Sequence, residues 1–260
     1  MRMVINSVTE ALRNFIQSYA VTFGGTFILL LIVYLLVWKL FAKSLNKWKI
    51  QQNRKADFKQ IKQEIINSIG VNFTGTLISM SVLSLYSRGS VKLYTDINQY
   101  GGISTAIGSF IFLLLFADAW FYFWHRWMHN NPKIYKYIHA VHHKSLDVTP
   151  FTASSFHILE ATLLGAWIIP LAFIIPIYVP MLGALQIIGL ANNIKSHLGY
   201  ELYPKWFQKT WLKYHINSTH HNLHHIKYNG NYGLLFTFWD IWFGTEIKET
   251  NQNFESLKGC

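Results

Sequence analysis

Histidines set at helical spacing are the residues of this chain that are best suited to chemistry. Residues three or four apart on a helix lie on one face, so their rings can aim at a common point. The chain repeats the spacing H-x2-HH twice and carries one H-x3-H pair just before the first copy. These eight histidines are His125, His129, His139, His142, His143, His221, His224 and His225.

The spacing of these histidines predicts a metal centre. Neutral imidazole is a good ligand for iron, zinc, copper and nickel. A structural zinc takes four ligands and a catalytic zinc usually takes three plus water, so eight imidazoles indicate two metal ions. The alternative is that each histidine is an ordinary surface or core residue. Three spaced groups in one chain favour the metal centre.

Further polar residues near these groups are candidates for the same site. His197 follows a long apolar run, and we expect it to be a ninth ligand. Asn193 lies about one helical turn before it and could bind a metal through water, or serve as a satisfied polar group of the helix. His220 directly precedes the last group and could support a ligand from outside. We expect His157 and His215 to be structural.

Asp118 lies in the apolar run that precedes the first histidine pair. An acid inside a membrane span is costly and usually has a partner. Two helical turns separate Asp118 from His125, which places the two residues on the same face. We therefore expect Asp118 to accept a hydrogen bond from a ligand ring.

Composition places the chain in a membrane. It is 51% hydrophobic and only 13% charged, whereas soluble proteins carry about 25% charged residues. The net charge of +11 comes from basic residues that flank apolar runs, which fits a membrane surface and not nucleic acid. The single cysteine, Cys260, excludes a disulfide framework and an iron–sulfur cluster.

Uncharged runs predict an all-α chain with its first three membrane spans at residues 14–38, 65–87 and 101–124. Each run is long enough to cross the roughly 30 Å apolar core of a bilayer. The loop between the first two spans, residues 39–62, is rich in lysine. A short basic loop is typical of the cytoplasmic side of a membrane. The third span would therefore deliver His125 to the cytoplasmic face.

The uncharged run at residues 161–194 is too long for one span. A straight helix of this length would reach about 51 Å. Three prolines interrupt the run: Pro170, Pro176 and Pro180. A bent hairpin that enters and leaves on the cytoplasmic side fits better, and it brings the total to about four spans. We expect residues 195–260 to form a cytoplasmic cap that carries the last histidine group.

Five motifs together resemble the sterol desaturase family of the fatty acid hydroxylase superfamily. They are HRWMH (125–129), HAVHHK (139–144), HHNLHH (220–225), NYG (231–233) and FWDIWFGT (238–245). The segment SSFHILE (154–160) is similar to sterol C5-desaturases and sphinganine hydroxylases, and HLGYE, from His197, resembles the family's single-histidine element. The resemblance covers residues 118–246. It implies a membrane anchor at residues 1–100 and a desaturase-like catalytic domain at residues 101–260.

The resemblance implies a non-haem site of two iron ions that uses O2 and two electrons to attack a lipid C–H bond. The product is either an alcohol or an alkene. The residues alone do not select iron, because a histidine-rich site also binds zinc, which could occupy a purified sample. Some lipid 2-hydroxylases of the superfamily have a histidine at the position of Asn193, so nine and ten ligands both stay open.

A sterol-like lipid is the preferred substrate, and a sphingoid-base or fatty-acyl hydroxylase is the alternative. A non-catalytic, histidine-rich membrane metal-binding protein is a third class. A transporter, however, would place its ligands near the bilayer midplane beside an acid-lined path. Acids are nearly absent from the predicted spans, which favours the oxidase.

Electrons must come from a separate carrier or reductase. The sequence has no haem-binding domain, no flavin or nicotinamide glycine fingerprint and no cysteine set for a cluster. The basic loop at residues 39–62 could receive an acidic carrier, although lipid headgroups are the preferred partner of such a loop. We expect a multi-pass protein of the endoplasmic reticulum in a eukaryote or of the inner membrane in a bacterium.

Overall fold

The computed structural model describes residues 2–259, with side chains from Thr9 onward. Helices make up nearly all of the regular structure in this range. Two short strands, β1 (Leu93–Tyr94) and β2 (Ile177–Tyr178), pair in parallel. The prediction of an all-α protein is confirmed; the sequence analysis did not foresee the small strand pair, which ties the connection after the second span to the tip of the hairpin.

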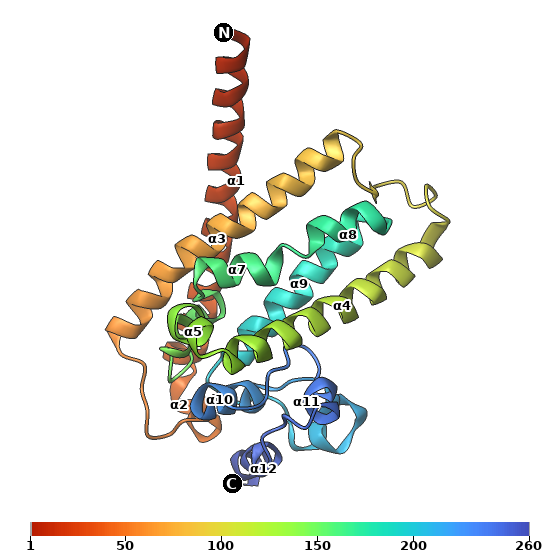
Figure 1. Ribbon diagram of the computed structural model, residues 1–260. Helices are drawn as coiled ribbons and strands as arrows, with labels where there is room; N and C mark the ends of the chain where they lie inside the picture. The colour runs from red at the N-terminus through yellow and green to blue at the C-terminus, as the bar shows by residue number, and fades with distance from the viewer. Residues whose placement is uncertain (1, 260) are drawn as a thin grey trace.

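Three helices are long and apolar enough to cross a membrane. They are α1 (Arg2–Tyr34), extended by the π-helix η1 (Leu35–Leu40), α3 (Phe58–Ser87) and α4 (Gly102–Asn130). The predicted spans at residues 14–38 and 65–87 fall inside the first two helices, and the third, at residues 101–124, begins one residue before α4. The first part of α1 extends beyond the rest of the molecule (Figure 1), and its apolar side chains are mostly exposed. By length and composition the chain is an integral membrane protein.

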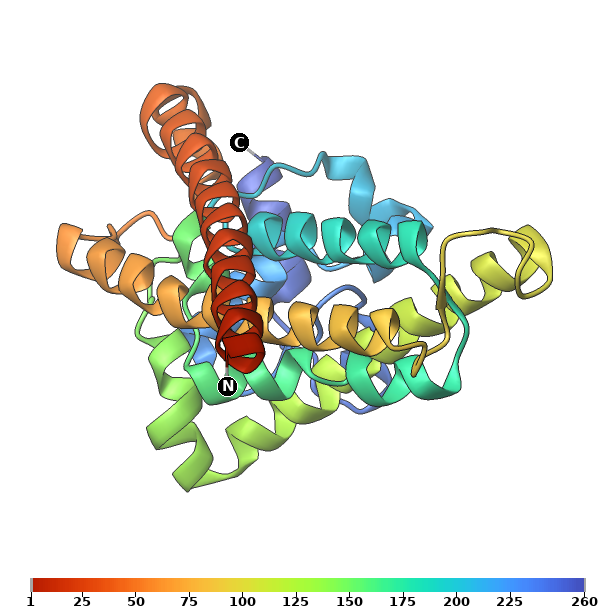
Figure 2. The same ribbon diagram turned by 90° about the horizontal axis from the view of Figure 1, so that it is seen from above.

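The predicted hairpin consists of α7 (Ile158–Gly165) and α8 (Ile168–Ile174), which run outward, and α9 (Val179–Ser196), which returns (Figures 1 and 2). Pro170 explains the break between α7 and α8, because proline has no N–H to donate to the carbonyl four residues earlier. That carbonyl belongs to Ala166, in the break itself. The membrane part is therefore three full spans plus this shorter hairpin.

Two apolar clusters hold the spans and the hairpin together. Val82 of α3 and Leu113 of α4 belong to one cluster with Ile168 and Ala172 of α8. A second cluster joins Leu30 of α1 to α9 and to the 3-10 helix η4 (Pro150–Ser154). Burial of such side chains contributes about 1.5–3 kcal/mol each, so the second span and the hairpin form a rigid frame.

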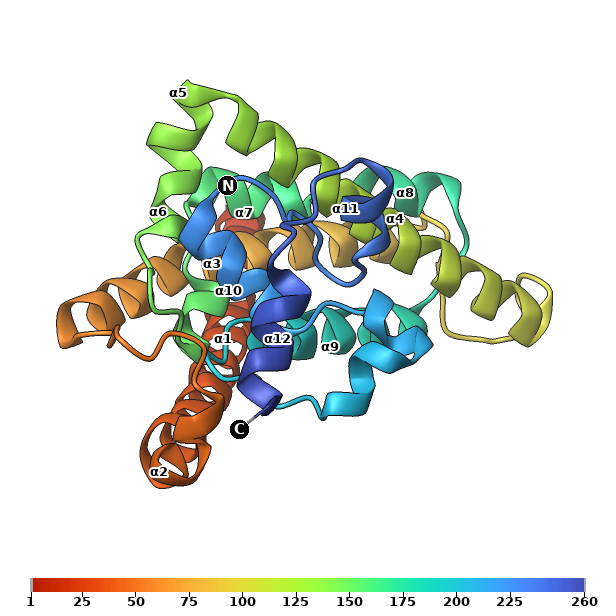
Figure 3. The ribbon, with the colours of Figure 1, turned by 90° about the horizontal axis from the view of Figure 1, so that it is seen from below.

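The cap lies across the ends of the spans that carry the histidines (Figure 3). Its helices are η5 (Lys205–Lys209), η6 (Trp211–Tyr214), α10 (Ser218–Lys227), α11 (Phe238–Trp242) and α12 (Thr250–Gly259). Five short helices complete the fold: α2 (Ala42–Leu45), η2 (Asn46–Trp48), α5 (Pro132–Ile134), η3 (Tyr135–His139) and α6 (Ala140–His143). The cap begins where the sequence analysis placed it.

The loop between the first two spans is part of this cap. Residues 46–56, here called the clamp loop, bury both Lys49 and Gln51. The Lys49 ammonium lies 2.8 Å from the Asp147 carboxylate, and the Gln51 amide donates to the side chain of Asn222 at 2.9 Å. The N-terminal segment therefore does more than anchor the chain in the membrane.

The Lys49–Asp147 pair should be a strong contributor to stability. Replacing one partner of a buried ion pair leaves an uncompensated charge, which costs about 3–5 kcal/mol. We expect Lys49→Met to lower the free energy of unfolding by about 3 kcal/mol, measured by denaturant titration in detergent micelles.

A second ion pair of the same length is the matched control. Lys227 and Glu249 also lie 2.8 Å apart, but their side chains are 40% and 51% exposed, against 10% and 3% for Lys49 and Asp147. Lys227→Met should cost less than about 1 kcal/mol. Equal losses for both variants would contradict a special role for the buried pair.

Candidate metal centre

The structure brings all nine histidines named as ligands into two adjacent groups. The five-histidine group consists of His125, His129, His139, His143 and His224, and the four-histidine group consists of His142, His197, His221 and His225. Within each group, one ring nitrogen from every residue lies within 4.8 Å of the others. The arrangement offers two centres for metal ions.

Helical spacing distributes each H-x2-HH copy between both groups. His139 and His143 are four residues apart and share the five-histidine group, while His142 turns toward the other group. In α10 the pattern is exchanged, since His221 and His225 share the four-histidine group. A π-turn, η3, ends at His139; such turns often occur at functional sites because they rotate the residues that follow.

Backbone carbonyls fix the orientation of four rings. The Nδ1 atoms of these rings lie 2.7–3.1 Å from a carbonyl oxygen. The pairs are His125 with Tyr232, His142 with Ser155, His197 with Asn193, and His224 with Gly230. A carbonyl only accepts, so Nδ1 must donate, and in a neutral imidazole Nε2 then carries a lone pair. All four rings therefore present a metal-binding nitrogen inward.

These inward nitrogens fit metal ions and do not fit hydrogen bonding among themselves. The Nε2 atoms of His142 and His197 lie 3.4 Å apart with two lone pairs facing each other, a contact that a shared cation would stabilise. Imidazoles about 2.1 Å from one ion place neighbouring nitrogens about 3 Å apart, close to the 2.9 Å between His197 and His221. Both ring nitrogens of His225 are buried without a hydrogen-bond partner among the described residues.

Burial also keeps the rings in the form that binds metals. It lowers the pKa of His142, His224 and His225 well below the usual value for histidine, because the charged form loses its hydration in the interior. The neighbouring rings lower these pKa values further by charge repulsion. The imidazoles are therefore neutral at pH 7.

Glu160 is a site residue that the sequence analysis did not assign. Its Oε1 atom lies 2.8 Å from Nδ1 of His139, and both side chains are almost fully buried. A carboxylate behind a ligand imidazole fixes its tautomer and raises its basicity. An acid at the start of an apolar helix, three residues after a histidine, was the signal that could have identified Glu160.

Asp118 does not contact a ligand ring, contrary to the sequence-based expectation. Its carboxylate accepts hydrogen bonds from the backbone N–H of Leu235 at 2.7 Å and from the indole of Trp239 at 2.8 Å. Two helical turns correspond to about 10.5 Å along the axis, too far for a short aspartate side chain to reach His125. Asp118 instead holds the segment that follows the last histidine group.

That segment contains the NYG and FWDIWFGT motifs, and the structure gives them a role. Asp240 accepts hydrogen bonds from the backbone N–H groups of Tyr232 and Gly233 at 2.8 and 2.9 Å. These bonds hold the loop whose carbonyls, at Gly230 and Tyr232, orient His224 and His125. The two motifs thus support the metal centre from outside.

The other polar candidates are placed as follows. The Asn193 amide donates to the Ala153 carbonyl at 2.7 Å, the satisfied polar group that was one of its two interpretations. The ring of His220 lies 3.5 Å from the Asp240 carboxylate and outside both groups. His157 caps α7 by accepting a hydrogen bond from the Leu159 N–H. His215 donates a hydrogen bond from Nδ1 to the Leu235 carbonyl, so both histidines have structural contacts.

Comparison with known proteins identifies the class. The sequence profile described as Fatty acid hydroxylase matches residues 110–245, just over half of the chain and all the histidine motifs. A helical membrane protein with two converging histidine groups is the class that the fold and site define. The chain belongs to the fatty acid hydroxylase family, and its relatives are consistent with the sterol desaturase branch.

Several curated relatives carry sterol-related names. The chain is 32% identical to Delta(7)-sterol 5(6)-desaturase ERG3B of Gibberella zeae over 72% of its own length and 56% of the relative. It is 34% identical to rat methylsterol monooxygenase 1 over 50% of its own length and 44% of the relative. It is 30% identical to human lathosterol oxidase over 70% of its own length and 59% of the relative. The chain thus spans about half the length of these relatives. No solved structure matches it.

Glu160 should raise the metal affinity of the five-histidine group, because it contacts His139. Loss of an outer carboxylate partner typically lowers metal affinity 10- to 100-fold. Glu160→Gln keeps the shape of the side chain. We expect it to lower the affinity of the five-histidine group for its metal ion by about this factor. Competition with a calibrated chelator measures the affinity.

Glu249→Gln is the control, because this side chain lies on the surface and pairs with Lys227. It should leave both metal affinities unchanged. If Glu160→Gln behaves like Glu249→Gln, the Glu160–His139 contact has no influence on metal binding.

Proposed function

We propose that this protein is an O2-dependent oxidoreductase that hydroxylates or desaturates a C–H bond of a membrane lipid at a centre of two iron ions. The observation that carries the proposal is the convergence of nine histidine imidazoles into two groups. His125, His129, His139, His143 and His224 would hold one ion, and His142, His197, His221 and His225 the other.

The iron pair would supply O2 activation. The chain's own residues would hold the ions, fix the orientation of the ligands and exclude water. Imidazoles are neutral, so they leave the positive charge of the ions uncompensated and favour the reduced state that binds O2. The carbonyls behind four of the rings prevent the ligands from rotating. Of the nine described ligand candidates, eight are buried, which keeps bulk water away from the centre.

His129 is the partly exposed member of the nine. Its ring lies against Tyr135, with ring centres 5.3 Å apart, and against Tyr232 at 5.2 Å. We propose this edge as the place where electrons enter from a separate carrier or reductase. We infer the membrane orientation from the basic loop, which would put this edge and the whole centre on the cytoplasmic face.

The substrate would be a sterol-like lipid. Support comes from the relatives, which include a sterol desaturase, a methylsterol monooxygenase and a lathosterol oxidase. The apolar spans and hairpin next to the centre suit a lipid body. The centre would therefore act on a substrate that stays in the membrane.

The test combines metal analysis with lipid oxidation. We expect about two metal ions per chain, mostly iron, by elemental mass spectrometry of the detergent-purified protein. His142→Ala should lower this content, because it removes one ligand of the four-histidine group. Purified protein with a chemical reductant, O2 and a sterol mixture should give an oxidised sterol, and His142→Ala should abolish it.

His157→Asn is the matched control, since asparagine retains the ability to cap α7 and His157 lies outside both groups. It should keep metal content and turnover. A folded protein without stoichiometric metal would make the histidines structural. Stoichiometric metal without oxidation of any lipid would instead favour a metal-binding protein.

A further inference from the structure

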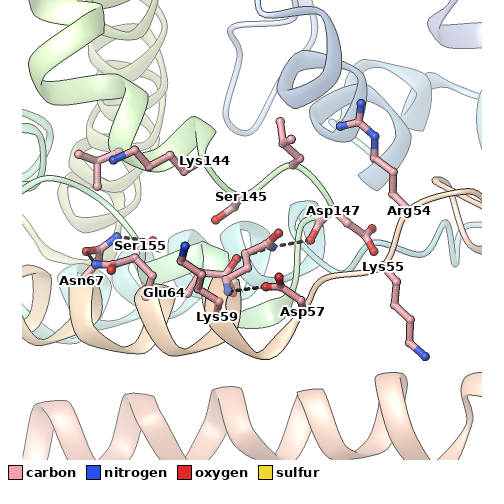
Figure 4. Close-up of a pocket in the computed structure, with 14 residues that line it drawn as sticks. Arg54, Lys55, Asp57, Lys59, Glu64, Asn67, Lys144, Ser145, Asp147 and Ser155 are labelled. Atoms are coloured by element: carbon pink, nitrogen blue, oxygen red, sulfur yellow. Dashed lines mark hydrogen bonds between the residues drawn. The ribbon is translucent and has the colours of Figure 1, made fainter.

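A cavity lined mainly by charged and polar residues lies beside the two histidine groups, and none of the nine histidines lines it. It measures about 740 Å³ and is bounded by the clamp loop, the first turns of α3 and the segment after α6 (Figure 4). Its walls come from Arg54, Lys55, Asp57, Lys59, Gln60, Gln63, Glu64, Asn67, Val141, Lys144, Ser145, Leu146, Asp147 and Ser155. Two of these fourteen side chains are apolar and seven are ionisable, so the cavity offers several charged groups to a ligand.

The acids of the cavity are already engaged. Asp57 caps α3 by accepting from the Gln60 N–H at 2.7 Å, and Asp147 is paired with Lys49. Glu64, which is buried, accepts hydrogen bonds from the hydroxyls of Thr149 and Thr152. The charge of Asp147 is therefore balanced by Lys49, and Glu64 is hydrogen-bonded inside the protein. Asp57 is the one exposed acid beside the four bases of the cavity.

The bases of the cavity have no such partners. Arg54, Lys55, Lys59 and Lys144 are exposed, and none of them forms a salt bridge within residues 9–259. Lys59 and Lys144 belong to opposite walls, one from α3 and the other from the end of α6 (Figure 4). An anion between them would meet positive charge from both sides.

The position of the cavity, at the end of a candidate membrane span, favours the headgroup of a lipid as the anion. Five lining residues lie on one face of the first three turns of α3, from Lys59 to Asn67, and α3 is a candidate membrane span. The end of a span lies at the level of lipid headgroups. The amides of Gln63 and Asn67 and the hydroxyl of Ser155 already form a hydrogen-bonded chain along this wall. Their remaining donors and acceptors are neutral groups that suit the hydroxyls of a headgroup.

We propose that this cavity binds the phosphate headgroup of an anionic membrane lipid, with Lys59 and Lys144 contacting the phosphate. The site is separate from the metal centre and holds whether or not the protein oxidises sterols. Free phosphate shares the same chemistry, so the test must distinguish the two sources.

The test is native mass spectrometry of the full-length protein in detergent, titrated with dihexanoyl phosphatidylglycerol. The double variant Lys59→Gln/Lys144→Gln should weaken binding about 25-fold, since each basic group near an anionic lipid contributes about a factor of five. Lys62→Gln is the matched control. Lys62 is an exposed lysine on the same helix, and it does not line the cavity.

Three further measurements decide between outcomes. The zwitterionic dihexanoyl phosphatidylcholine should bind more weakly than phosphatidylglycerol, and Lys59→Arg/Lys144→Arg should restore binding. If only inorganic phosphate binds, and the double Gln variant loses this binding, the cavity is an anion site for free phosphate and the lipid assignment is wrong. Equal lipid binding by the double Gln variant and Lys62→Gln, with unchanged melting temperatures, would overturn the proposal.

Discussion

The structure depends on one electrostatic constraint, which is that lone pairs of neutral imidazoles converge without protons between them. Each ring would prefer to turn away or to accept a proton. Four of the rings donate a hydrogen bond from Nδ1 to a backbone carbonyl, at Tyr232, Ser155, Asn193 and Gly230. Burial disfavours the protonated, charged form of the imidazoles. The fold therefore holds an arrangement that suits a bound cation. The cap supplies two of the four carbonyls, at Gly230 and Tyr232.

The supports come from every part of the chain. Carboxylates of Asp118 and Asp240 anchor the loop that presents two of the carbonyls, and α7 contributes Glu160. Gln51 of the clamp loop reaches Asn222 between the ligands of α10. Mutations far outside the histidine motifs should thus affect the same centre, because the ligands themselves have little freedom to adjust.

Much of this could be predicted from sequence. Apolar runs located the three spans, prolines located the hairpin, and helical spacing gathered the histidines that the structure brings together. Contacts between segments could not be predicted, because they depend on how helices pack and not on periodicity. Asp118 shares a helical face with His125 but lies too far along the axis. Glu160 lies on α7 and becomes the neighbour of His139 only through the packing of the hairpin. The burial of Lys49 in a basic loop left no local signal.

The clamp loop has a consequence for the order in which the protein can be made. Gln51 and Asn222 are 171 residues apart in sequence, and Lys49 and Asp147 are 98 apart. The ribosome releases the loop long before its partners exist, so two buried polar groups must wait at the membrane surface during translation. Contacts of such long range form slowly. The nascent chain would therefore pass through a stage in which the spans are inserted and the cap is still open, so both histidine groups would be completed only after α10 has been made.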